Sequence, residues 1–74
     1  MPDFAGEIRR RLAPLTIRAE REAEIVDELT QHLEDRVRDL CGAGVSLAEA
    51  EAAALAELEG GDVLVRAVAA VERR

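Results

Sequence analysis

The chain has 74 residues, a formal net charge of −6, ten arginines, no lysine and a single aromatic residue, Phe4. This length allows one domain that buries about 60% of its extended surface on folding, so the expected core is small. The acidic charge, the lack of stacking side chains, and the absence of a long apolar run or a secretory signal exclude nucleic-acid binding, membrane insertion and secretion. We therefore expect a cytoplasmic protein.

Residues that favour helices dominate the chain, and no segment alternates apolar and polar side chains as a strand would. The sequence predicts a single compact all-α domain (1–74) of four helices, at about residues 4–13, 17–43, 47–59 and 63–73. In the first helix, Asp3 is the expected N-cap, and Phe4, Ile8 and Leu12 lie on one face. Pro14 ends this helix because it disfavours helical geometry at the preceding residue.

The second helix is predicted to be the spine of the domain, about 40 Å long, with Thr16 as its N-cap. It carries a continuous apolar stripe formed by Ile25, Val26, Leu29, Leu33, Val37 and Leu40. We expect Leu29 and Leu33 to be buried against the first and third helices.

The end of the second helix carries a specific turn signal. Gly44 suits the left-handed C′ position of a Schellman motif, which places the apolar residues Leu40 and Val45 at its two contact positions. Ser46 and Glu49 then have the spacing of a capping box. The second and third helices are therefore predicted to form a tight hairpin.

The third and fourth helices complete the predicted core. The third helix has an apolar face formed by Leu47, Ala50, Ala54, Leu55 and Leu58. The pair Gly60 and Gly61 ends it, and Asp62 can cap the fourth helix. The inward residues of the fourth helix are expected to be Leu64, Val68 and Val71.

The whole net charge lies in one half of the second helix, because residues 20–35 contain seven acids and one arginine (1 − 7 = −6). On a helical wheel, several of these side chains lie opposite the leucines and form a candidate partner-binding surface, the acidic ridge: Glu20, Glu24, Asp27, Glu28, His32 and Asp35. Two interpretations are open, a solvated helix face or a docking surface for a basic partner. The cluster Arg9–Arg11 would weaken the second interpretation if it folded over the ridge.

No pattern in the sequence indicates an enzyme, a metal site or a cofactor. His32 and Ser46 are the only residues of their types, and Ser46 is already assigned to a cap. Glu28, His32 and Asp35 share a helix face but supply too few elements for a metal site, so we expect His32 to be a surface residue held by Glu28. Cys41 is expected to be a small apolar residue near a helix end, in a reducing compartment.

Several runs between residues 7 and 62 are recognisable: EIVDEL at 24–29, HLEDR at 32–36, AGVS at 43–46, EA at 49–50 and ALAEL at 54–58. They resemble the permease prefix domain, a helical module at the N-terminus of FtsX/MacB-like duplicated permeases of bacteria. They are also similar to helical modules encoded beside PadR-like repressors.

The resemblance implies a cytoplasmic, non-enzymatic interaction or regulatory module. Its partner would be the cytoplasmic loops of a permease, at the inner face of the membrane, or a PadR-like regulator. Because no membrane segment follows, we expect an excised domain or a free-standing relative. The alternative is a homodimerisation module, since Val26, Leu29, Leu33 and Leu40 follow coiled-coil spacing, which Arg36 interrupts.

Overall fold

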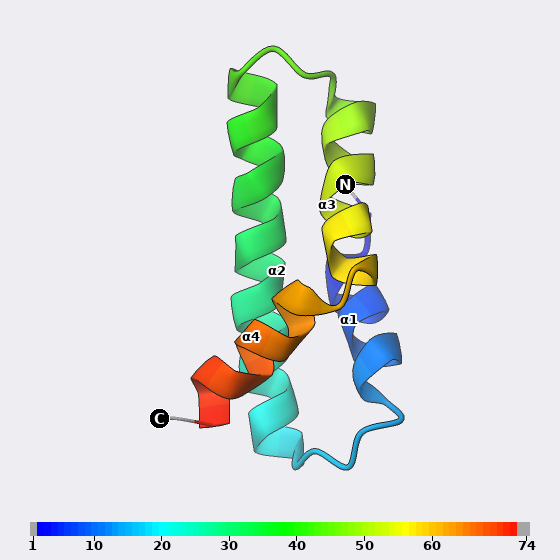
Figure 1. Ribbon diagram of the computed structural model, residues 1–74, viewed down its shortest axis with the longest axis vertical. Coiled ribbons are helices and arrows are strands. Elements are labelled where there is room, and N and C mark those ends of the chain that lie inside the picture. Colours follow the sequence, from blue (N-terminus) through cyan, green and yellow to red (C-terminus); the bar gives the residue numbers. More distant parts are fainter. Residues whose placement is uncertain (1, 73–74) are drawn as a thin grey trace.

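The computed structural model describes residues 2–72, which form four α-helices joined by short turns (Figure 1). The helices are α1 (Phe4–Leu12), α2 (Ala19–Gly42), α3 (Leu47–Glu59) and α4 (Asp62–Glu72). The prediction of an all-α domain of four helices around a long second helix is confirmed. Among residues 2–72, no helix combines the length and the apolar character needed to span a membrane.

The spine of the domain is α2, and each of the other helices packs against it (Figure 1). Its 24 residues make it about 36 Å long, which accounts for most of the longest dimension of the molecule, 38 Å. α3 returns along the C-terminal half of α2, whereas α4 crosses the N-terminal half obliquely. The N-terminal half of α2 therefore has α4 beside it.

The core is wholly apolar, because no polar or charged residue is buried in the described chain. Its members are Phe4, Ile8, Leu12, Ile25, Val26, Leu29, Leu33, Val37, Ala50, Ala54, Leu58 and Val71. The predicted stripe of α2 thus supplies five of the buried residues, and Leu40 is half-buried at its end. The prediction for Leu47 is wrong: as the first residue of α3 it lies beside the turn, and its side chain is 56% exposed.

The turn between α2 and α3 has the predicted Schellman geometry. The Val45 N–H donates to the carbonyl of Leu40 (3.0 Å) and the Gly44 N–H donates to that of Cys41 (3.1 Å). Gly44 has a φ of 97°, a left-handed conformation that only glycine adopts without strain. Ser46 Oγ then accepts from the Glu49 N–H (3.2 Å), which is the serine half of the predicted capping box.

The predicted starts of α1 and α3 are confirmed, whereas those of α2 and α4 differ, and α1 and α2 each end one residue earlier than predicted. Asp3 caps α1 as expected, accepting from the Gly6 N–H at 3.0 Å. Thr16 is not the N-cap of α2, because the Ile17 N–H bonds to the carbonyl of Leu15 and the helix begins only after Arg18, which provides no side-chain cap.

The start of α4 also differs from the prediction by one residue. Asp62 is the first residue of the helix rather than its cap. The preceding Gly61 accepts from the Val65 N–H at 3.0 Å. Arg73, the predicted last residue of this helix, lies outside the described residues.

The Schellman turn can be tested with the same substitution at two neighbouring glycines. Gly44→Ala places a side chain at a positive φ and should lower the free energy of unfolding by about 1 kcal/mol. Gly42→Ala is the control, because Gly42 is helical and an added Cβ would have no neighbour within 4 Å. The control should be neutral or stabilising in chemical denaturation. Equal effects of the two substitutions would contradict the turn assignment.

The burial of α2 can be tested with two leucines that differ in exposure. Leu33→Ala empties a site whose side chain is 0% exposed and should cost about 2–5 kcal/mol in denaturant titrations. Leu47→Ala removes the same atoms from an exposed position and should change stability by less than about 0.5 kcal/mol. A Leu33→Ala variant that unfolds at the wild-type denaturant concentration would show that the stripe is not part of this core.

Candidate acidic interaction surface

Part of the acidic ridge lies on a side of α2 that is open to solvent. Its carboxylates at Glu20, Glu24 and Asp27 are exposed, as the helical wheel predicted. The opposite side of the same helix is closed by the apolar core, so α2 cannot rotate to hide these charges without exposing its leucines. The orientation of the ridge is therefore set by the packing of the whole domain.

Arg21 is the one cation among residues 20–35, and it is directed away from the ridge. Its Nη1 donates to the backbone carbonyl of Val71 at 2.8 Å, in a contact that is partly buried between α2 and α4. This carbonyl lies in the last turn of α4, where it has no donor within the helix. Arg21 therefore fixes the end of α4 on α2 and leaves the ridge acidic.

The C-terminal end of the ridge, at Asp35, is less accessible to a partner than its centre. Asp35 is half-buried and accepts from Gln31 Nε2 and from Arg38 Nη1, both at 3.0 Å. Both partners lie on α2 itself, at spacings of three and four residues. Asp35 is thus partly neutralised by its own helix, which leaves residues 20–28 as the more strongly acidic part.

Glu28 and His32 belong to a groove as well as to the ridge. The groove has a volume of about 400 Å³ and lies where α2, α3 and α4 meet. Its apolar lining residues are Leu29, Val63 and Ala67, and its polar ones are Glu28, His32, Glu57 and Arg66. The structure thus adds α3 and α4 residues to a surface that helical periodicity had placed on α2 alone.

Glu57 is the polar residue that links α3 to α2 in this groove. Its Oε1 lies 3.1 Å from Arg36 Nε, and its Oε2 lies 3.8 Å from His32 Nε2. The Oε2 atom is buried and has no hydrogen-bond partner among the described residues. The expectation that Glu28 holds His32 stays a prediction, and the contact with Glu57 of α3 is one between helices that periodicity does not reveal.

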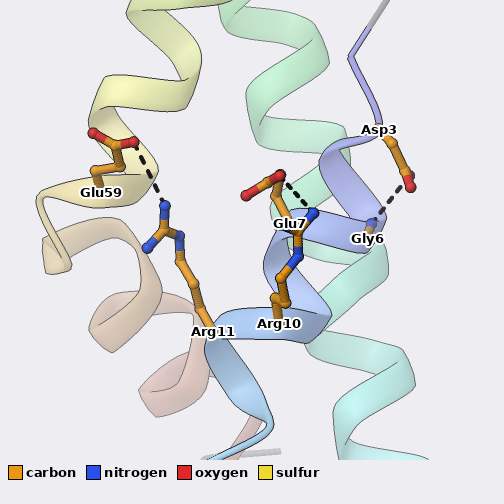
Figure 2. A network of polar contacts seen from close by, with 6 residues as sticks. All are labelled: Asp3, Gly6, Glu7, Arg10, Arg11 and Glu59. Atoms are coloured by element: carbon orange, nitrogen blue, oxygen red, sulfur yellow. Dashed lines mark hydrogen bonds and ion pairs between the residues drawn. The ribbon is translucent and has the colours of Figure 1, made fainter.

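Arg10 and Arg11 of α1 do not fold over the ridge. Figure 2 shows Arg10 directed at Glu7 of its own helix and Arg11 directed at Glu59 at the end of α3. The two pairs have nitrogen to oxygen distances of 2.7 and 3.7 Å. Two of the three arginines that could have neutralised the ridge, Arg10 and Arg11, therefore interact with other carboxylates.

The described residues do not form a cluster of metal-ligating side chains. Within residues 2–72, no group of three or more histidine, cysteine or carboxylate side chains is placed to hold a metal ion. Ser46 is engaged as a helix cap, and Cys41 is exposed in the last turn of α2. Glu28, His32 and Asp35, which share a helix face, are not among any such group.

The chain matches no family model, no curated protein sequence and no solved structure. Its function is therefore inferred from its own residues and their arrangement.

The role of Arg21 can be tested by removing its donors while keeping its apolar stem. Arg21→Met should lower the free energy of unfolding by about 1 kcal/mol and speed amide hydrogen exchange in α4, because the carbonyl of Val71 loses a charged donor. Arg38→Met is the control, since Arg38 is 74% exposed and pairs only within α2. Its effect should stay within about 0.5 kcal/mol. Unchanged exchange in α4 of the Arg21 variant would refute the anchoring role.

Proposed function

We propose that this chain is a non-enzymatic interaction module that binds a partner protein with a basic surface through the acidic ridge. The observation that carries the proposal is the arrangement of charge on α2. Exposed carboxylates project from a helix whose opposite side is buried, and the one local arginine is engaged elsewhere. Five of the seven acids in residues 20–35 thus belong to one side of α2.

Like charges at this spacing lower the stability of the helix. A surface that served only to keep the domain solvated would not need this spacing. Glu20, Glu24 and Glu28 follow one another at four-residue spacing, and each like-charge pair of this kind destabilises a helix by a few tenths of a kcal/mol. In return, a concentrated acidic surface attracts a basic partner over several ångströms and raises its association rate. This balance favours a docking role over a purely solvating one.

The resemblance to the permease prefix domain and to modules encoded beside PadR-like repressors indicates which class of protein the partner would belong to. A permease prefix domain would contact the basic cytoplasmic loops of its permease, and a module encoded beside a PadR-like repressor would contact that regulator. In either case we place the interaction in the cytoplasm, at the inner face of the membrane for the permease. Both partners would present arginine or lysine to the ridge.

A homodimer seam along α2 has less support than docking. The residues with coiled-coil spacing, Val26, Leu29 and Leu33, are at most 2% exposed because α1, α3 and α4 already cover them. Pairing two copies through this stripe would require the domain to open. The structure thus leaves the acidic side of α2, and not its apolar side, available to a partner.

The proposal can be tested with a fluorescent peptide of alternating glycine and lysine as a model basic partner. Stopped-flow association should slow at higher ionic strength, because salt screens the ridge. The variant Glu24→Gln/Asp27→Asn should reduce the on-rate about two- to fivefold and flatten its salt dependence.

The matched control removes the same charge from the two sides of the α2–α3 turn, Asp39 on α2 and Glu49 on α3. Asp39→Asn/Glu49→Gln lies beside the α2–α3 turn and should leave the on-rate close to that of the wild type. An on-rate that is insensitive to salt and to the ridge variant, or equally sensitive to both double variants, would refute docking at the ridge.

A further inference from the structure

We propose that the outward side of α4 pairs with the α4 of a second copy of this chain, with the two helices antiparallel and crossing near Val65. The paired surface, here called the α4 patch, consists of Leu15, Leu64, Val65, Val68 and Ala69. It lies apart from the acidic ridge of α2, so the inference goes beyond the proposed function and does not depend on it.

The helix α4 is covered on one side only. Eight of its eleven residues are apolar, yet Val71 is the only one of them that is buried. Val63 and Ala67 line the groove towards α2 and α3, whereas Val65 points to solvent and is 67% exposed. A helix that is apolar on both of its sides has a second surface to bury.

The exposed apolar side chains of the domain gather at this surface. Among residues 2–72, the large apolar residues that are exposed are Leu15, Leu47 and Val65. Two of these three, Leu15 and Val65, line one cavity of about 310 Å³, together with the half-buried Leu64 and Val68. Single exposed apolar residues are ordinary on a monomer, but a contiguous group of them marks an interaction surface.

The charges beside the α4 patch match a second copy of the same surface. Asp62 and Arg66 are exposed and lie one turn apart on the same side of α4, next to Val65. Within residues 2–72 neither side chain forms an ion pair. An antiparallel copy reverses the order of the two charges, so Arg66 of each chain faces Asp62 of the other.

This self-matching favours a second copy over other occupants. A two-fold interface brings the same surface of both chains together, so it needs both signs of charge on that surface. The α4 patch has both, whereas the acidic ridge would repel its own copy. The apolar stripe of α2 is already covered by the core, so α4 provides the apolar surface that two folded chains can share.

The small size of α4 sets the strength of the dimer. Its eleven residues span about 16 Å. A contact of this length buries less than about 1,200 Å² in total, which is the range of weak and transient interfaces. We therefore expect a dimer that forms at high micromolar concentration and dissociates on dilution.

Sedimentation equilibrium of the full chain between about 20 µM and about 1 mM should show a monomer that converts to a dimer as concentration rises. Val65→Gln should weaken the dimer about tenfold or more, because the substitution enters the interface twice. Glutamine is a good helix former, so this exposed substitution should preserve the fold. Leu47→Gln is the matched control, since Leu47 is 56% exposed but lies beside the α2–α3 turn. It should leave the dimerisation constant unchanged.

A charge exchange tests the antiparallel arrangement. Asp62→Arg places two arginines opposite each other and should weaken the dimer about fivefold or more, while Asp62→Arg/Arg66→Asp restores opposite charges and should return it to within about twofold of the wild type. Both variants carry the same change at the start of α4, and circular dichroism checks that both are folded. A wild-type chain that stays monomeric, a Val65→Gln variant that dimerises like Leu47→Gln, or a folded double variant as weak as the single one would overturn the proposal.

Discussion

Burial of the apolar stripe of α2 is the constraint on which the rest of the structure depends. The stripe is too long for one neighbouring helix to cover, so α1, α3 and α4 all pack on it and meet around it. Once that side of α2 is closed, the direction of every other α2 side chain is determined. The acidic side chains face solvent because the leucines face the core.

The position of the proposed interaction surface follows from the same packing. α4 crosses the N-terminal half of α2 beside the ridge, where Arg21 holds its last turn. Where α4 leaves α3, the three helices do not close completely, and the groove forms between them. The groove therefore borders the acidic ridge, and Glu28 belongs to both.

Features encoded by neighbouring residues were predictable from the sequence, whereas features encoded between helices were not. Gly44, Val45 and Ser46 specify a turn through their own backbone preferences, so the hairpin could be predicted in detail. The start of α2 depends on how the preceding segment returns from α1, which no local signal near Thr16 encodes. Likewise, periodicity placed His32 on α2 correctly but gave no indication of Glu57, since the angle between α2 and α3 decides that contact.

The most direct test of the whole arrangement is a map of backbone amide chemical shifts during titration with the glycine–lysine peptide. We expect the largest changes along residues 20–28 of α2 and at residues 63–67 of α4, which border the groove, with little change in the α2–α3 turn. Changes concentrated in that turn, or where Leu15 of the α1–α2 connection lies beside Val65 of α4, would contradict the assignment of the acidic side of α2 as the binding surface.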